Sequence, residues 1–247
     1  MLLRNVCILT CFVGCPTAMA AKVNLQVSNY PPYVEEKSSR QGVITQIVVE
    51  ALKSKRVKST VHFNDWIEVE NQVDNHKALS FMWTKTKARL KKWHFSDPIY
   101  IQRKKFVSAD NFSRNINYLH NLRGLKIGFT RFFTYGNQIE NFRQKLTITE
   151  HDSDFLAVQA LVKNQVDLVA MDEMTAAYWL NQSTNKSGKR FKFINTPHFD
   201  SVSYFVVCSK SYGNCLNHIK KFNQGLAIIQ KDGTSKSLLN RAESVQQ

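Results

Sequence analysis

An alternation of strand-like and helix-like segments constrains the fold of this 247-residue chain more than any other feature of its sequence. In the clearest instance, a helix capped by Asp154 precedes the continuous apolar run "VDLVAM" (166–171), which is followed by Asp172. Parallel strands buried on both faces are apolar in this way. A carboxylate just past such a strand lies where open α/β sheets bind ligands, so Asp172 is a candidate site residue. The inner face of the helix is predicted to carry Phe155, Val158, Leu161 and Val162.

Similar units fill most of the remaining chain. Residues 22–29 alternate apolar and polar side chains, as a half-buried strand does, and run into "YPPY", where two prolines stop the strand beside Tyr30 and Tyr33. The next helix is predicted to bury one face, made of Val43, Ile44, Ile47, Val48, Ala51 and Leu52. Alternating elements favour an α/β fold with largely parallel strands and helices on both faces. Further strands are predicted at 59–66, 77–83, 104–109, 125–130, 190–194 and 201–209, with a short helix at 67–75 and a last helix from about 217 to 231 that ends at Gly233.

The first twenty residues differ from the rest. Arg4 precedes the short apolar stretch "VCILTCFVG", and "AMA" at 18–20 provides a cleavage site, so residues 1–20 are interpreted as a secretory signal peptide. No later segment approaches the roughly 18 uninterrupted apolar residues of a transmembrane helix. The mature chain is expected to be soluble and periplasmic. An alternative is acylation of Cys15 in a lipobox-like "FVGC", although Phe12 departs from the usual Leu or Val.

Cysteine content agrees with export. Only Cys208 and Cys215 remain after removal of the signal, and an oxidising compartment favours a disulfide between them. No His or Cys pair at metal-ligand spacing accompanies them, and "HDSD" (151–154) is better explained as a helix cap than as a metal site, so no metal is expected. The sequence also has no Walker A, GxSxG or GxGxxG motif, which leaves nucleotide, hydrolase and dinucleotide functions without support.

The formal net charge of +15 raises the question of an anionic partner. The basic residues are scattered along the chain rather than gathered in a tail or on one helix, and an exported protein seldom meets nucleic acid, so no nucleic-acid partner is expected. The densest stretch, "TKTKARLKK" (84–92), contains five basic side chains. We interpret its lysines as solvated charges around a turn and short helix, and Arg89 as the functional cation.

Several motifs occur in a characteristic order along the mature chain: "YPPY"; "T-x-T-x-x-R" with "FSDPIY"; "LRGLKIG" followed by "YGN"; "ALVKNQVDLVAMDE"; and "FNQGLAIIQKDGTSKSL". Together they resemble the bacterial extracellular solute-binding proteins of family 3, periplasmic proteins that serve polar amino acid uptake. The resemblance implies a two-lobed α/β, periplasmic-binding-protein-like (type II) fold with a hinge of crossing strands. Lobe one is expected to comprise residues 21–102 plus 204–247, and lobe two residues 103–203.

The resemblance also assigns ligand contacts. Arg89 matches the arginine that holds the ligand's α-carboxylate through a bidentate fork, Thr84 adds a hydroxyl donor, and Asp172 matches the acid that pairs with the α-ammonium. This set is chemically reasonable, because a zwitterion needs a planar cation and a carboxylate, and Arg suits paired hydrogen bonds better than Lys. The aromatic wall and further lining are assigned to Tyr33, Tyr30, Trp83 and Trp66.

One turn departs from the family pattern. Where the family usually has a glycine, "IGFTRFFTYG" (127–136) places Phe132 and Phe133. These rings could stack on an aromatic ligand or pack as core, and Arg131 beside them could contact an anion or be solvated. Phe133 and Thr134 are retained as candidate ligand contacts.

The function implied is capture of a small polar or amino-acid-like solute between the lobes, for delivery by a monomeric protein to the membrane permease of an ABC transporter. No cofactor and no catalysis are expected. Two alternatives remain: a periplasmic dehydratase-like enzyme on the same fold, with Asp172 or Glu173 as general acid, and a soluble sensor that docks on a membrane receptor.

Overall fold

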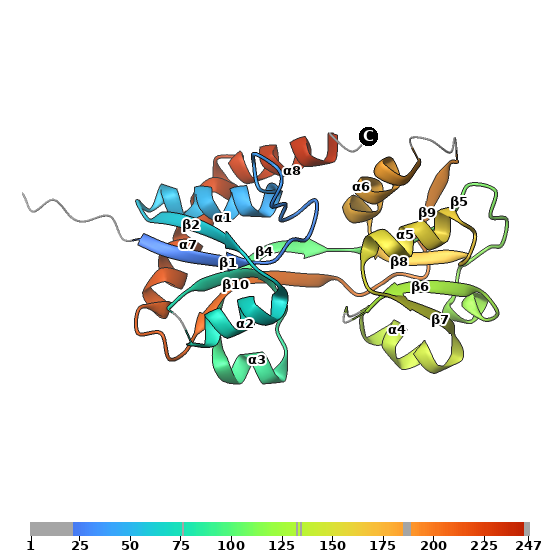
Figure 1. The fold of residues 1–247 in the computed structure, drawn as a ribbon, viewed down its shortest axis with the longest axis horizontal. Coiled ribbons are helices and arrows are strands. Elements are labelled where there is room, and N and C mark those ends of the chain that lie inside the picture. The colour runs from blue at the N-terminus through green and yellow to red at the C-terminus, as the bar shows by residue number, and fades with distance from the viewer. Residues whose placement is uncertain (1–21, 76, 132, 134, 185–188, 245–247) are drawn as a thin grey trace, which may run out of the picture.

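The computed structural model describes residues 22–75, 77–131, 133, 135–184 and 189–244 (Figure 1). These residues form two five-stranded sheets in two lobes that lie side by side along the long axis of the molecule. The predicted signal peptide with Cys15, and the turn residues Phe132 and Thr134, lie outside the described residues.

The sheet of the first lobe contains parallel and antiparallel pairs. β1 pairs in parallel with β2 and β3, whereas β10 runs antiparallel to β3 and β4. Because β10 comes from the far end of the sequence, the chain enters this lobe twice. In spatial order the strands are β2 (Lys58–Phe63), β1 (Lys22–Val27), β3 (Leu79–Trp83), β10 (Val202–Ser209) and β4 (Trp93–Gln102).

The sheet of the second lobe has the same mixed character. β6 pairs in parallel with β7 and β8, and β5 runs antiparallel to β8 and β9. In spatial order the strands are β7 (Thr147–His151), β6 (Lys126–Thr130), β8 (Leu168–Asp172), β5 (Lys104–Ala109) and β9 (Phe191–Ile194).

The prediction of largely parallel strands is therefore wrong, and the cause lies in the connection between the lobes. A strand followed by a packed helix returns parallel to its neighbour, and this rule holds for β1, β2 and β3 and for β6, β7 and β8. The strands β4, β5 and β10 instead run between the lobes without a crossover helix, and they join their sheets antiparallel.

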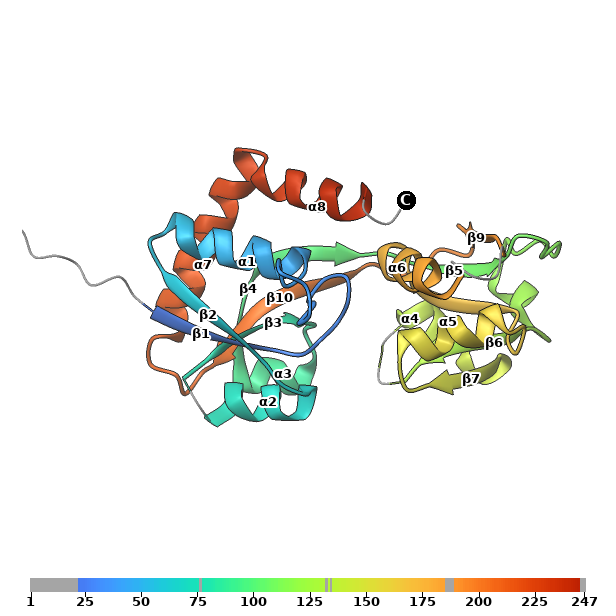
Figure 2. The same cartoon turned by 45° about the horizontal axis from the view of Figure 1, so that its top comes forward.

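Helices cover both faces of each sheet (Figures 1 and 2). In the first lobe, α1, α7 and α8 lie on one face and α2 and α3 on the other; in the second, α5 and α6 lie opposite α4. The helices are α1 (Val43–Ser54), α2 (Trp66–Asn75), α3 (Lys87–Lys92), α4 (Asn137–Phe142), α5 (Asp154–Val162), α6 (Glu173–Thr184), α7 (Cys215–Lys231) and α8 (Thr234–Ser244), with 3-10 turns at Leu119–Leu122 and Arg143–Lys145. All six apolar residues predicted for the inner face of α1 are buried.

Three helix predictions need correction at their ends. The cap of α5 is Ser153, whose hydroxyl accepts from the N–H of Leu156, and Asp154 is the first helical residue. Phe155, which was predicted to face inward, is 38% exposed, because the buried face of α5 consists of Asp154, Ala157, Val158, Ala160 and Leu161. Similarly, Trp66 begins α2 rather than ending a strand, because the Asp65 carboxylate accepts from the N–H of Glu68.

The helix predicted to be the last, at about 217–231, is followed by one more helix. α7 does end before Gly233, whose φ of +83° suits glycine. A further helix, α8, then begins at Thr234, whose N–H donates to the Asp232 carboxylate at 2.9 Å. This segment was not predicted as a helix because its sequence is polar, yet α8 packs on α1 and α7.

A disulfide joins Cys208 at the end of β10 to Cys215 at the start of α7, as predicted. None of the helices in the described ranges is both long and apolar enough to cross a membrane.

Candidate functional site

Asp172, the last residue of β8, is held at the start of α6 by three donors. One oxygen of its carboxylate accepts from the N–H groups of Met174 at 3.0 Å and Thr175 at 3.1 Å, as an N-cap does, and from the hydroxyl of Tyr33. Only 4% of Asp172 is exposed. The predicted acid thus also caps a helix, a role that the sequence interpretation did not include.

The donor Tyr33 comes from the other lobe. It belongs to the "YPPY" segment between β1 and α1, which Figures 1 and 2 show close to α6. Two residues later, Glu35 accepts a 2.7 Å hydrogen bond from the hydroxyl of Tyr178 on α6. Met174 is buried in the apolar core of the first lobe, and the ring of Phe133 meets that of Tyr30 edge-on at 5.6 Å. The first turns of α6 and residues 30–35 therefore form a contact between the lobes.

Gln102, at the junction of β4 and β5, connects several of these groups. Its amide nitrogen donates to the Tyr30 hydroxyl at 3.0 Å, and its amide oxygen accepts from the Tyr204 hydroxyl at 2.9 Å and from Lys104 Nζ at 3.1 Å. Gln102 is fully buried. Since Tyr204 lies on β10, the two strands that cross between the lobes are linked at this residue.

Lys104 is a buried cation that the sequence interpretation missed. Its ammonium lies 5.5 Å and 5.2 Å from the ring centres of Phe133 and Tyr135, and electrostatic interactions couple it to Asp154 and Asp172. A period-two reading of the strand "KKFVSA" would have placed Lys104 on the same buried face as Phe106, so a signal was present.

Burial shifts the pKa values of the ionisable side chains around Asp172. It raises the pKa of Asp172 and of Asp154, lowers the pKa of Lys104, and raises the pKa of Tyr33 well above its ordinary value. Tyr33 therefore remains a protonated donor at neutral pH.

The predicted carboxylate-binding residues form a second group, on the first lobe. Arg89 lies in the first turn of α3, and Nη1 of its guanidinium donates to the hydroxyl of Thr84 at 3.0 Å and to its carbonyl at 3.2 Å. The guanidinium also lies 4.6 Å from the ring centre of Trp83. Trp66 meets Trp83 edge-on at 5.1 Å, so three predicted residues support Arg89 directly or through one contact.

A bulge positions this group. Between the pairs Trp83↔Phe205 and Ser80↔Val207, β3 contains one residue more than β10. Buried Met82 lies there with a φ of +67°, a conformation that costs about 1–3 kcal/mol for a residue other than glycine. β-Bulges commonly redirect side chains beside functional sites, and this one lies immediately before Trp83 and Thr84.

The structure thus gathers the predicted residues into two groups, one around Asp172 and one around Arg89. Among the described residues, no hydrogen bond or ion pair joins Arg89 to Asp172. Arg131 is engaged elsewhere, in surface ion pairs with Asp152 at 2.5 Å and Glu150 at 3.7 Å. The lysines of the 84–92 stretch are exposed as expected, namely Lys85, Lys87, Lys91 and Lys92.

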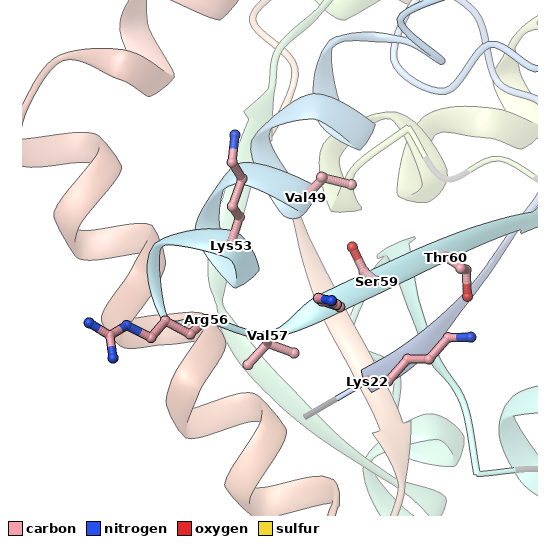
Figure 3. Close-up of a pocket in the computed structure, with 8 residues that line it drawn as sticks. Lys22, Val49, Lys53, Arg56, Val57, Ser59 and Thr60 are labelled. Carbon is pink, nitrogen blue, oxygen red and sulfur yellow. The ribbon is translucent and has the colours of Figure 1, made fainter. Parts of the chain in front are cut away.

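An open hollow of about 750 Å³ lies elsewhere, between α1 and β2 on the first lobe (Figure 3). None of the predicted site residues lines this hollow, so it is not the candidate site, which is defined by the residues around Asp172 and Arg89. Its lining consists of Lys22, Val49, Lys53, Arg56, Val57, Lys58, Ser59 and Thr60. In the described part of the chain, no cluster of His, Cys, Asp or Glu has the composition of a metal site.

Comparison with known proteins identifies the fold. No protein-family model matches the chain, and no curated protein matches it. Solved structures do. The GluR0 ligand-binding core from Nostoc punctiforme in complex with L-glutamate has a TM-score of 0.69 at 18% identity, covering 89% of this chain and 98% of its own. An arginine transport system periplasmic binding protein from Legionella pneumophila has a TM-score of 0.69 at 20% identity, covering 90% and 99%.

A third structure, substrate-binding domain 2 of GlnP from Lactococcus lactis in an open conformation, has a TM-score of 0.70 at 17% identity, covering 92% of this chain and 97% of its own. All three span nearly their full length on this chain. The protein therefore has the two-lobed, periplasmic-binding-protein-like α/β fold that the sequence predicted.

Proposed function

We propose that this protein binds a small polar or amino-acid-like solute between its lobes and presents it to a membrane protein, the permease of an ABC transporter or a receptor. The observation that carries the proposal is a supported guanidinium on the first lobe together with a carboxylate where the second lobe contacts the first. Lobe one would comprise residues 21–102 and 204–247, and lobe two residues 103–203. A two-lobed binding protein closes when one ligand contacts both lobes.

The environment of Arg89 supports its assignment to an anionic group. Thr84 and Trp83 hold the guanidinium in place, which lowers the conformational cost of binding. Within the guanidinium, only Nη1 donates a hydrogen bond to another of the described residues. The remaining N–H groups can form the two parallel hydrogen bonds that a carboxylate accepts.

The structural neighbours support the class of ligand. They are a ligand-binding core in complex with L-glutamate, an arginine transport system periplasmic binding protein and a substrate-binding domain. These neighbours, the signal-like residues 1–20 and the disulfide favour a binding protein that acts outside the cytoplasm and performs no catalysis. No cofactor is needed for this function.

The test begins with a thermal-shift screen of amino acids, amines, short peptides and organic acids, since a ligand at about 100 times its Kd adds about 2.7 kcal/mol to the stability. Calorimetry on the best ligand then compares Arg89→Ala with wild type. We expect a loss of about 2–5 kcal/mol of binding free energy, because an anion enclosed between the lobes would lose its charged partner.

The matched control is Lys91→Ala, which removes an exposed cation from the same helix and should leave the affinity unchanged. Arg89→Lys should fall between the two, since it keeps the charge and loses the fork. Equal affinities for Arg89→Ala and wild type would refute the role of Arg89, and silence across the whole screen would count against solute capture.

A further inference from the structure

The side chain of Tyr33 covers the carboxylate that a ligand's cation is proposed to reach. Tyr33 is fully buried, Asp172 is 4% exposed, and the hydroxyl of the first donates to the carboxylate of the second. The ring of Tyr33 is itself held by the rings of Tyr30 at 5.4 Å and Tyr100 at 5.0 Å. The Tyr33 hydroxyl occupies the same carboxylate oxygen that caps α6, so a cation that binds this oxygen from the space between the lobes must replace Tyr33.

The same hydrogen bond joins the two lobes. Tyr33 belongs to the segment between β1 and α1, whereas Asp172 ends β8 in the second lobe. Its neighbours reinforce the contact, because the Tyr178 hydroxyl donates to Glu35 and Met174 is buried in the core of the first lobe. Separation of the segments that carry Tyr33 and Asp172 therefore requires a change in how α6 packs on the first lobe.

We propose that Tyr33 is an internal competitor of the ligand: its hydroxyl occupies Asp172 and holds the lobes together until a cationic group of the solute replaces it. This inference rests on the proposed function, and it predicts which solutes can bind. A hydrogen bond from a charged donor to a carboxylate is roughly twice as strong as one from a neutral donor. An ammonium or guanidinium can displace the phenol, whereas a neutral or purely anionic solute cannot, so solutes with a cationic group are selected.

The lobe-holding part can be tested without any ligand. Spin labels at Lys87→Cys on the first lobe and Gln144→Cys on the second, both exposed positions, report the interlobe distance by pulsed electron resonance while the native disulfide remains intact. Tyr33→Phe keeps the buried ring and removes only the hydroxyl. We expect it to lengthen or broaden the distance distribution.

A double-mutant comparison shows whether the effect passes through Asp172. In an Asp172→Ala background, which has no side-chain acceptor, Tyr33→Phe should change the distance distribution much less than it does in wild type, because the two side chains act as one unit. If Tyr33→Phe leaves the distribution unaltered, or alters it equally in both backgrounds, Tyr33 is only part of the aromatic wall and the proposal fails.

The competition part is tested by titrating L-arginine and L-glutamate, which share an ammonium group, and succinate, which has none. Removal of a competing neutral hydrogen bond should tighten binding of the two amino acids to Tyr33→Phe by roughly fivefold. Succinate should not bind either protein measurably. Weaker amino acid binding by Tyr33→Phe would show that the hydroxyl assists ligand binding, and equal binding would show that it has no effect. Either result would contradict the proposed competition.

If neither amino acid binds wild type or variant, amino-acid capture is contradicted, while the distance measurements still decide whether Tyr33 and Asp172 hold the lobes together. Tyr178→Phe is the matched control for an interlobe hydroxyl outside this pair: its effect on the distance should persist in the Asp172→Ala background.

Discussion

At the scale of single residues, three buried ionisable groups lie close to the contact between the lobes. Asp154 accepts from the Thr130 hydroxyl and is influenced electrostatically by Lys104 and Asp172. Burial raises the pKa of Asp154 and of Asp172 and lowers the pKa of Lys104, so the charged form of each group is less favourable in the folded state than in the unfolded chain.

The sign of the pH dependence follows from the raised pKa of Asp154. Unfolded Asp titrates near about 3.9, so as the pH rises the unfolded chain releases this proton first, and stability falls until the folded carboxyl has also ionised. Asp154→Asn removes that decline. Urea unfolding at several pH values between about 4 and 7 should show wild type losing stability relative to the variant as the pH rises.

The control for this measurement is Asp152→Asn, two residues earlier, where the side chain is 69% exposed. Its difference from wild type should change little over the same range. Parallel curves for wild type and Asp154→Asn would show that burial of Asp154 has no energetic consequence.

At the scale of elements, the contact between α1 and α7 depends on a glycine within a helix. A Cβ added at Gly225 would lie 1.9 Å from the carbonyl oxygen of Ala51, far inside any allowed contact. The two helix backbones therefore approach more closely than any side chain permits. This close approach lets Phe222 and Leu226 of α7 reach the core of the first lobe.

Helix propensity and packing predict opposite outcomes for Gly225→Ala. Propensity alone favours Ala over Gly by about 1 kcal/mol in a helix interior, whereas overpacking costs about 1–3 kcal/mol and more when the obstacle is backbone. We expect packing to dominate, so that the free energy of unfolding by urea decreases. The exposed neighbour Gln224→Ala should be neutral or slightly stabilising, and a stabilised Gly225→Ala would contradict the close packing.

At the scale of the whole molecule, the two lobes share one buried polar junction. Gln102 bonds to Tyr30, Tyr204 and Lys104, which come from a loop of the first lobe, from β10 and from β5. Both connecting strands pass this residue, so its amide links the hinge to the contact between α6 and residues 30–35.

Removal of this amide should weaken the whole protein. In Gln102→Leu, buried polar groups that now bond to the amide lose their partner, at about 1–3 kcal/mol each, so we expect a loss of more than about 2 kcal/mol on unfolding by urea. Gln230→Leu, exposed on α7, provides the control. A loss no larger than that of the control would show that water or a rearranged neighbour replaces the amide.

The sequence by itself determined the elements whose signals are local. Periodicity identified the buried face of α1, the apolar run identified β8, and cysteine content identified the disulfide. The ordered motifs also predicted the two-lobed fold that the solved structures establish. These features depend on side-chain spacing within one segment or on the order of segments, which a sequence states directly.

Only the tertiary structure decided how separate segments meet. Strand direction in β5 and β10 depends on passage between the lobes, and the burial of Lys104 and Gln102 depends on elements from both. The bond from Tyr33 to Asp172 joins residues 139 positions apart. The packing of whole lobes fixes such contacts. It also sets the energy of a buried charge or hydrogen bond, because the cost of desolvation arises only when segments distant in the sequence come together and exclude water.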